Sequence, residues 1–382
     1  MKPLHRTGIV RDPRYAGHCT APDQPECQQR LDAVCDMLDG HVLKDALQQI
    51  TPQPVSRQAL LRVHSGAHIR RMENTKGRPA TYLDSDTSIS PMSHDTALLA
   101  AGGLCQAIKL VHNNALDNAF ALIRPPGHHA ERSAAKGFCL YNNIAVGAKY
   151  AQHTLGLKRI LIVDWDLHHG NGTQHCFEED STVLFFSTHR SFFYPGSGRL
   201  RDTGKGAGKG FTINIPLLPG FGDGDYLVLF ERILKPIALE FDPDLILVSA
   251  GFDIHFKDPM GGMRVTPKGF AGLTRSLMDM ADACCEGKLV MALEGGYDPG
   301  ALSESVMEVL KEMSGLQTTD KSALLATADR KKTAGILWRV KQVHRKYWPC
   351  LTALPEGDSD APPSLPDRFR SRLAQLTAYF KS

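Results

Sequence analysis

The sequence has no hydrophobic run long enough to cross a membrane, because its apolar stretches fall well short of the roughly 18 residues that a transmembrane helix needs. It also lacks an apolar segment directly after Met1 and Lys2. A signal peptide requires such a segment. We therefore expect neither a membrane span nor a signal peptide.

Paired cysteines are missing as well. The chain has nine cysteines, an odd number, and no CxxC motif. Disulfide-rich secreted domains usually carry an even number at regular spacings. Scattered cysteines are typical of reduced thiols, so we expect a cytoplasmic protein.

A strong charge of either sign is also absent. The formal net charge is only +3, and the basic surplus begins after Gly315. Nucleic-acid-binding domains usually cluster their lysines and arginines, so we predict no direct nucleic-acid binding. The 42% hydrophobic and 22% charged residues are ordinary for a globular protein with a buried core.

Short apolar runs rich in β-branched residues recur along the chain and predict buried strands. These runs are residues 7–10, 119–123, 159–163, 182–187, 211–215, 245–249 and 288–293. Stretches with helical spacing lie between most of them, at residues 96–111, 144–154, 224–241, 269–285 and 302–313. This alternation predicts an α/β fold in which helices cover both faces of a mostly parallel sheet.

No internal repeat or long low-complexity linker interrupts residues 1–313, so we predict one domain over residues 1–315. Residues 316–382 are predicted to form a helical C-terminal extension packed on the same domain. Its apolar stripe is Trp338, Val340, Val343 and Tyr347. Residues 355–366 contain four prolines and predict an exposed loop. A basic helix on a membrane surface is the alternative for this extension, disfavoured because docked amphipathic helices are commoner.

Acids, histidines and a tyrosine follow four of the predicted strands. The segments are RPPGHH (124–129), DWDLHHGNGT (164–173), AGFD (250–253) and EGGY (294–297). In parallel α/β sheets, ligands bind outside the carboxyl ends of the strands. We therefore predict a functional site at this edge of the sheet.

The Asp-x-Asp-x-His run predicts a metal site. Residues two apart in extended backbone face the same side, so Asp164, Asp166 and His168 can point in one direction. Without a cation, such a cluster would be costly to bury. Asp166 and His168, completed by Asp253 from another strand end, would make the open three-ligand site that catalytic zinc uses. The alternative, a solvated loop or salt-bridge cluster, is disfavoured because the run follows a strand of the buried type.

His128 and His129 are predicted to handle protons rather than to bind the metal. Adjacent residues face different directions, and imidazoles titrate near neutral pH. Asp164 and Asn171 are the candidate partners that would orient them. Tyr297 follows two glycines and could donate a hydrogen bond to an oxyanion. The alternatives are ordinary core or loop histidines and a packing tyrosine.

These segments, in their order, resemble the motifs of the histone deacetylase family. The motifs are RPPGHHA (124–130), GFCLYNN (137–143), DWDLHHGNGTQ (164–174), SAGFD (249–253), DPMGG (258–262) and LEGGY (293–297). The likeness runs from about Thr7 to Gly315 and is nearest to the class II branch and its bacterial amidohydrolase relatives. It implies the arginase–deacetylase fold, a single three-layer α/β domain whose mostly parallel sheet has about eight strands. It also implies zinc-dependent hydrolysis of linear amides.

The resemblance also implies roles for single residues. It makes Asp166, His168 and Asp253 the zinc ligands. It makes His129 the general base and acid, with His128 as its electrostatic neighbour. Asp164 and Asn171 would support these two histidines, and Tyr297 would be the oxyanion donor. It makes Asp86, Gly137, Phe138, Tyr194 and Met260 substrate-binding residues, with the Tyr194 hydroxyl at the rim of an acyl-lysine tunnel. It places a structural monovalent cation, usually potassium, at Asp164, Asp166, His168, Ser187 and Thr188.

The substrate implied is an N-acetyl or short N-acyl amide, above all acyl-lysine in a protein or peptide. Hydrolysis would release acetate and a free amine. An acetylpolyamine or other small-amide hydrolase is the alternative, weakened because class II polyamine deacetylases carry Glu where this chain has Met260. A non-catalytic protein that binds acylated ligands is a further alternative, disfavoured by the completeness of the site. The oligomeric state stays open, and a homo-oligomer is compatible with the sequence.

Overall fold

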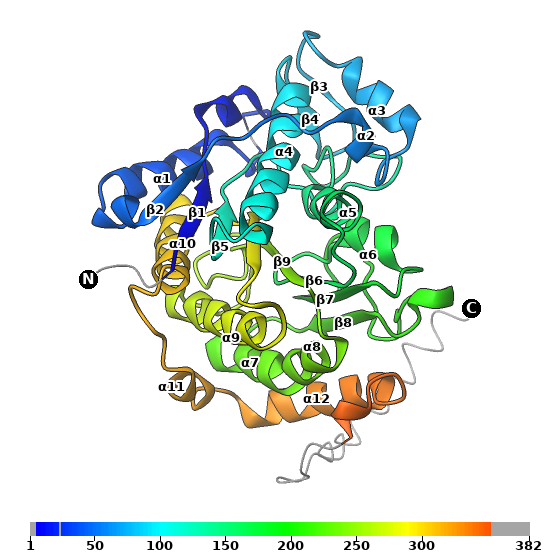
Figure 1. Ribbon diagram of the computed structural model, residues 1–382, viewed down its shortest axis with the longest axis vertical. Helices are drawn as coiled ribbons and strands as arrows, with labels where there is room; N and C mark the ends of the chain where they lie inside the picture. The colour runs from blue at the N-terminus through cyan, green and yellow to red at the C-terminus, as the bar shows by residue number, and fades with distance from the viewer. Residues whose placement is uncertain (1–4, 23, 353–382) are drawn as a thin grey trace.

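In the computed structural model, which describes residues 5–22 and 24–352, eight parallel strands form the central sheet. They are β1 (Thr7–Val10), β2 (Leu47–Ile50), β5 (Asn118–Ala121), β6 (Ile160–Asp164), β7 (Val183–Arg190), β8 (Thr212–Leu217), β9 (Leu245–Ala250) and β10 (Leu289–Leu293). Their order across the sheet is β2-β1-β5-β10-β9-β6-β7-β8 (Figure 1). This confirms the predicted α/β fold and its mostly parallel sheet of about eight strands.

The four strands that precede the predicted site are neighbours in the middle of the sheet. β5, β10, β9 and β6 follow one another in the strand order. The register places Asp164 at the end of β6 beside Ser249 of β9, and Leu293 of β10 beside Ala250 of β9. The carboxyl ends of these strands therefore reach one edge of the sheet, and the segments that follow them start side by side.

Helices cover both faces of the sheet, as predicted. They are α1 (Gln28–Asp39), α2 (Arg57–Leu60), α3 (Gly66–Glu73), α4 (Ser93–His112), α5 (Asn143–Leu155), α6 (Asn171–Phe177), α7 (Asp223–Leu229), α8 (Lys235–Phe241), α9 (Pro267–Cys285), α10 (Pro299–Met313), α11 (Lys321–Leu325) and α12 (Arg330–His344). On one face α4 packs against α5 (Figure 1). On the other face α9 packs against α7, α8 and α10, and α10 packs against α1. Strands enclosed in this way are apolar on both sides.

All seven predicted strands are present, but β2 and a small hairpin were missed. The sequence of β2 is LQQI, and its two glutamines are exposed at the edge of the sheet, so no apolar run marks it. The hairpin consists of β3 (Thr81–Tyr82) and β4 (Ser88–Ile89), which are antiparallel. Strands of two residues are too short to show a periodic pattern.

The helix predicted over residues 224–241 is interrupted in the structure. A π-helical turn at Phe230–Leu234 separates α7 from α8, and the N–H of Lys235 donates to the carbonyl of Phe230, five residues back. Pro236 explains the interruption. It has no N–H to donate, and its ring would clash with the carbonyl four residues earlier in a regular α-helix. The wider π turn removes this conflict.

The described part of the C-terminal extension packs on the body of the protein. The N–H of Asp329, which caps α12, donates to the Asp225 carboxylate at 2.7 Å. The indole N–H of Trp348 donates to the carbonyl of Gly210 at 2.9 Å. The division of the chain after residue 315 stays a prediction, and the predicted loop at residues 355–366 lies outside the described residues.

The predicted apolar stripe of α12 is partly wrong. Trp338 is 38% exposed, whereas Ile336, Val340, His344 and Trp348 are buried. Ile336, Val340 and His344 recur at intervals of four and form one face of the helix, and Trp348 lies beyond its end. The sequence pattern missed this face because it includes a histidine, which is not counted as apolar.

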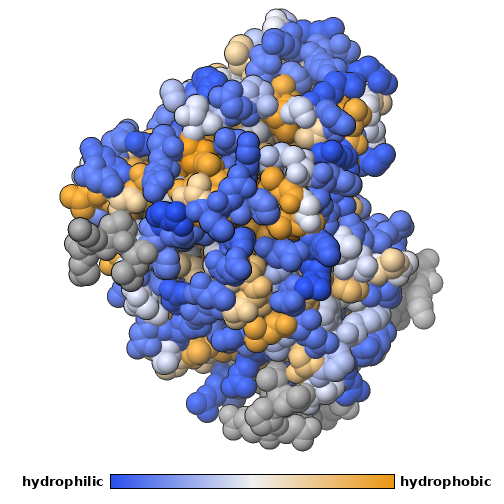
Figure 2. Space-filling model, viewed as in Figure 1, coloured by the Kyte–Doolittle hydropathy of each residue, from blue (hydrophilic) through white to orange (hydrophobic). Residues whose placement is uncertain are grey.

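Hydrophobic side chains are concentrated in the interior. On the face seen in Figure 2, hydrophobic residues form small separate areas in a mostly hydrophilic surface. Within residues 5–22 and 24–352, no helix combines the length and the apolar character needed to span a membrane.

Candidate functional site

Asp166, His168 and Asp253 meet at the carboxyl edge of the sheet. The chain leaves β6 at Asp164 and turns, so that Asp166 and His168 face Asp253, which follows β9. Nδ1 of His168 lies 3.0 Å from Oδ1 of Asp166 and 3.0 Å from Oδ2 of Asp253. All three residues are buried, and one donor atom of each lies within 4.8 Å of the others. The structure therefore brings together the three residues predicted as metal ligands.

Backbone N–H groups hold these carboxylates in place. The N–H of Gly295 donates to Oδ2 of Asp166 at 2.9 Å, and the N–H of Leu167 donates to Oδ1 of Asp253 at 2.8 Å. A Cβ atom on Gly251 would collide with the Asp166 carboxylate. Glycine is therefore required at this position for the backbone to approach the site closely.

The donor set fits a zinc ion. Two carboxylate oxygens and one imidazole nitrogen are ligands that zinc accepts, and three protein ligands leave a further position open. Burial, together with the charge of Asp166, raises the pKa of Asp253 to about 7. Two acids held this closely in the interior disfavour each other's ionisation, and a divalent cation between them would offset that repulsion.

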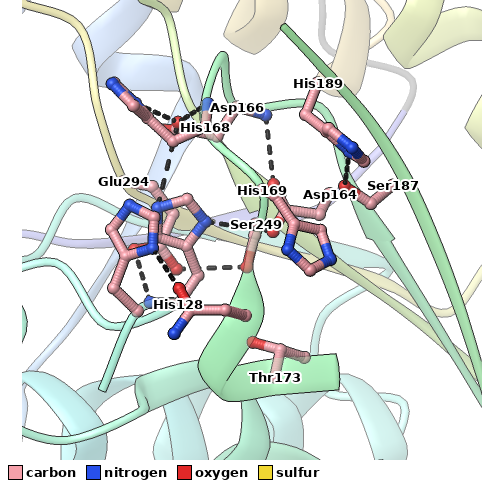
Figure 3. Close-up of polar contacts among 12 residues, drawn as sticks. His128, Asp164, Asp166, His168, His169, Thr173, Ser187, His189, Ser249 and Glu294 are labelled. Atoms are coloured by element: carbon pink, nitrogen blue, oxygen red, sulfur yellow. Dashed lines mark hydrogen bonds and ion pairs between the residues drawn. The ribbon is translucent and has the colours of Figure 1, made fainter. Parts of the chain in front are cut away.

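His128 is oriented by Asp164. Its Nδ1 lies 3.0 Å from Oδ2 of Asp164, and its Nε2 lies 3.8 Å from Oδ1 of Asp166 (Figure 3). Because a carboxylate only accepts, Nδ1 carries a proton. Burial lowers the pKa of His128, but the charges of Asp166 and Asp164 outweigh it and raise the value to about 10. The two carboxylates therefore favour the protonated form of His128.

His129 belongs to a separate chain of hydrogen bonds that ends at the surface. Its Nδ1 lies 2.7 Å from Oδ1 of Asn171, whose amide nitrogen donates to Glu131 at 2.6 Å. Glu131 also accepts from His175 at 2.9 Å. Since the Glu131 carboxylate only accepts, it fixes which end of the Asn171 amide faces His129. Nδ1 of His129 therefore carries the proton, and its Nε2 has a free lone pair.

Burial and the neighbouring imidazoles keep His129 neutral. Burial is the largest effect, and the charges of His128 and His168 add to it, so the pKa of His129 lies well below its ordinary value. The two adjacent histidines thus differ, because the pKa of His128 is raised whereas that of His129 is lowered.

Tyr297 is positioned from both sides. Its backbone N–H donates to the Asp258 carboxylate at 2.7 Å, and the guanidinium carbon of Arg30 lies 5.0 Å from the centre of its ring. Burial and the charges of Asp253 and Asp166 raise the pKa of the Tyr297 hydroxyl well above its usual range. The phenol therefore keeps its proton and can donate a hydrogen bond.

Gly137 and Phe138 form the tip of a tight turn beside the site. Lys136 and Cys139 exchange two backbone hydrogen bonds of 3.0 Å, and the φ angles of Gly137 and Phe138 are +56° and +65°. The N–H of Gly137 donates to Oδ1 of Asp86 at 3.2 Å. Asp86 lies in the β3–β4 hairpin, so this hairpin holds the turn that carries Phe138, a predicted substrate-binding residue.

Tyr194 and Phe138 both lie against predicted catalytic residues. The Tyr194 ring meets the His129 ring edge to face at 5.0 Å, and the Phe138 ring meets the Tyr297 ring at 6.1 Å. The Tyr194 hydroxyl is buried and has no hydrogen-bond partner among the described residues. Our prediction that this hydroxyl lies at the rim is therefore wrong, because the ring points inward, towards Gly137.

Met260 is tied to the same site through Asp258. The Asp258 carboxylate accepts from the N–H of Met260 at 2.9 Å, in addition to that of Tyr297. The Arg190 guanidinium donates to the Met260 carbonyl at 3.2 Å. Arg190 and Asp258 therefore hold the backbone that carries Met260.

The comparisons with known proteins agree with this geometry. The model of the histone deacetylase domain matches residues 24–313. A probable deacetylase of Archaeoglobus fulgidus is 40% identical, in an alignment that covers 90% of this chain and 99% of that protein. The chain belongs to the histone deacetylase family.

Other members of the histone deacetylase family are similar at comparable identity. The polyamine deacetylase HDAC10 of Danio rerio is 38% identical over 88% of this chain, but the match spans only 50% of that longer protein. A crystal structure of the HDA15 HD domain has 36% sequence identity and a TM-score of 0.84, and the match covers 91% of this chain and 97% of that one. The similarity to the HDA15 HD domain agrees with the arginase–deacetylase fold.

The residues that the family resemblance assigns to a potassium site also lie together. Asp164 pairs with Ser187 across β6 and β7, and Thr188 follows Ser187. All three are buried, and Oγ1 of Thr188 has no hydrogen-bond partner among the described residues. That a cation binds there stays a prediction.

Sequence reasoning missed the role of Glu294, although this residue directly follows a predicted strand. Its carboxylate accepts from the N–H of Gly127 at 2.6 Å, from the N–H of His128 at 3.2 Å and from the Ser249 hydroxyl at 3.1 Å (Figure 3). Burial raises its pKa to about 7. Glu294 thus connects β10 and β9 to the loop that carries His128. An acid that directly follows an apolar strand is the signal that could have revealed it.

Sequence reasoning also missed the role of Glu26. This buried carboxylate pairs with Arg124 at 2.5 Å and with Arg30 at 3.0 Å. Arg30 then donates to the carbonyls of Glu294 and Gly296, at 2.6 and 2.5 Å. Glu26 therefore fixes the guanidinium that holds the turn before Tyr297. Arg30 and these two carbonyls are more than 260 positions apart along the chain, so local patterns could not connect them.

Proposed function

We propose that the protein is a zinc-dependent deacylase that hydrolyses the acetyl or short acyl amide of a modified lysine side chain. The observation that carries this proposal is the buried cluster of Asp166, His168 and Asp253 beside two histidines, each oriented by a hydrogen bond to Asp164 or Asn171. Asp166, His168 and Asp253 would hold the zinc ion, which when bound polarises the amide carbonyl and lowers the pKa of water.

The chain's own residues would move the proton and stabilise the developing charge. Nε2 of His129 removes a proton from the attacking water and later delivers it to the departing amine. Asn171 keeps His129 in the tautomer that leaves Nε2 free to accept. The Tyr297 hydroxyl donates to the oxyanion of the tetrahedral intermediate, a contact worth about 3 kcal/mol in the transition state. Water and the amide are consumed, and a carboxylate and an amine are released.

We favour acyl-lysine over acetylated polyamines as the substrate. A polyamine carries several positive charges, and an acid near the entrance would attract it. Here Met260 takes the place of that acid, and the Arg190 guanidinium lies at its carbonyl. The Lys136 ammonium also lies 5.8 Å from the centre of the Tyr194 ring. The similarity to a polyamine deacetylase keeps a small acylated amine as the second candidate.

A substrate panel separates these two candidates. Acetyl-lysine peptides, longer acyl-lysine peptides and acetylated polyamines would be offered to the zinc-loaded protein and to the chelated protein. Turnover of peptides that chelation abolishes is the expected result. A preference for free acetylpolyamines would contradict the proposed substrate while keeping the proposed chemistry.

A further inference from the structure

Phe192 is an aromatic side chain in an unusual position. It is 99% exposed, and its φ angle is +55°, in the left-handed region that bulky residues rarely adopt. Neither feature stabilises the folded protein. A single exposed apolar residue needs no explanation, but exposure combined with backbone strain at the edge of an active site suggests a function.

The neighbours of Phe192 hold it in this conformation. The backbone N–H and hydroxyl of Ser191 both donate to the carbonyl of Leu217, at 2.8 and 2.9 Å. On the other side, the Phe193 ring stacks on His168 at 5.4 Å and carries the Arg190 guanidinium at 4.2 Å. The residues before and after Phe192 are therefore both anchored, and the ring between them points into solvent.

The position of Phe192 places it beside the entrance. It is two residues from Tyr194, so their Cα atoms are at most about 7.6 Å apart. An acyl-lysine inserted between Phe138 and Tyr194 leaves its own backbone outside, at the mouth. Since an extended chain advances about 3.3 Å per residue, the residues flanking the acyl-lysine come within reach of Phe192.

We infer that Phe192 is a docking residue for the polypeptide that carries the acyl-lysine, and that it contacts an apolar residue next to the modified one. This inference rests on the proposed function, because it takes the acyl group to enter between Phe138 and Tyr194. A free acylated amine has no flanking apolar residue and gains nothing from the phenyl ring.

Peptide binding to a protein with slowed turnover tests this inference. The probe is a fluorescent ten-residue peptide with a central acetyl-lysine flanked by leucines, bound to the zinc-loaded Tyr297→Phe protein and followed by anisotropy. Its competitors are acetyl-lysine with both ends blocked, and acetylspermidine. Adding Phe192→Asn to this protein should weaken binding of the peptide about tenfold more than it weakens binding of the blocked acetyl-lysine. Asparagine tolerates a positive φ, so the fold is expected to persist.

Two controls make the test specific. Val42 is 78% exposed in the 3₁₀ turn Val42–Ala46, so Val42→Asn removes an exposed apolar side chain elsewhere and should leave peptide affinity unchanged. Phe192→Asn alone should melt at or above the temperature of the unmodified protein, because it relieves strain. Equal weakening of the peptide, the blocked residue and acetylspermidine would overturn the inference, as would a lower melting temperature or an unchanged peptide affinity.

Failure of the docking inference can be told from failure of the proposed function. Peptide that binds through Phe192 but is not hydrolysed by the unmodified zinc protein would contradict the deacylase and support the docking residue. Peptide that is hydrolysed, and that binds equally well with Phe192→Asn, would contradict the docking residue alone.

Discussion

Which nitrogen of His129 carries the proton is decided by a residue that does not touch it. Glu131 accepts from the Asn171 amide nitrogen, which turns the amide oxygen towards His129. Glutamine at position 131 could present either an oxygen or an N–H₂ group to Asn171. The amide would then be free to turn, and part of the population would hold His129 in the wrong tautomer.

We therefore predict that Glu131→Gln lowers kcat about tenfold and leaves KM nearly unchanged. Steady-state rates on an acetyl-lysine peptide measure this effect. Glu178→Gln is the matched control, because the Glu178 carboxylate pairs with the surface residue Lys205. An unchanged kcat in Glu131→Gln would contradict the orienting role.

Tyr297→Phe tests the oxyanion donor. Removing one such donor typically lowers kcat about a hundredfold or more. The substitution leaves the three predicted metal ligands untouched, so zinc content measured on the purified protein should not change. Tyr82→Phe, at a tyrosine that is 53% exposed on β3, should leave both quantities unchanged. A rate for Tyr297→Phe within threefold of the unmodified protein would remove this hydroxyl from the mechanism.

At the scale of elements, the turn at Gly137 joins the β3–β4 hairpin to His129, the predicted general base. A Cβ atom there would collide with the His129 ring and lie 3.0 Å from the Tyr194 hydroxyl. Gly156, which ends α5, also has a positive φ of +78°, but a Cβ atom on it would meet nothing within 4 Å. Comparing alanine substitutions at these two glycines therefore separates the effect of backbone strain from the effect of steric contact.

We predict that Gly137→Ala and Gly156→Ala each lose about 1 kcal/mol from the strain of a positive φ. Only Gly137→Ala should also lose most of its deacylase activity, because the His129 ring must move. Urea unfolding and peptide rates measure the two effects. Equal activity in both variants would show that the turn does not position His129.

The strands that supply the site could be predicted because they are buried on both faces and therefore appear as continuous apolar runs. The elements around the entrance could not. β3 and β4 are two residues long, and α6 begins only at Asn171, within the motif itself. The ligand candidates Asp166, His168 and Asp253 followed from their places after strands. Glu131 and Glu26 lie in loops, and only the tertiary structure connects them to His129 and Tyr297.

At the scale of the whole molecule, His344 in the C-terminal helix α12 makes the stability of the protein depend on pH. Its side chain is buried, neither ring nitrogen has a hydrogen-bond partner among the described residues, and burial and the charge of Lys346 lower its pKa to about 4. The neutral form is therefore favoured in the folded state. Its contribution to stability is complete above pH 6.5 and is lost as the pH falls towards 4.

The free energy of unfolding should therefore fall by about 2 kcal/mol between pH 6.5 and pH 5 because of His344, since one pKa unit corresponds to about 1.4 kcal/mol. His344→Leu should remove this part of the acid sensitivity. Urea unfolding at pH 7.5 and pH 5.0 compares the two proteins. The same loss of stability in both would show that His344 does not titrate in this range.

The proposed activity depends on a bound zinc ion, and one measurement tests this dependence most directly. The protein would be stripped with a chelator, shown to be free of metal, and reloaded with one equivalent of zinc. Release of acetate from an acetyl-lysine peptide would be measured in each state. We predict turnover with zinc, none after stripping and full recovery on reloading. If the protein holds one zinc ion but releases no acetate from any acetylated peptide or amine, the proposed deacylase activity is contradicted.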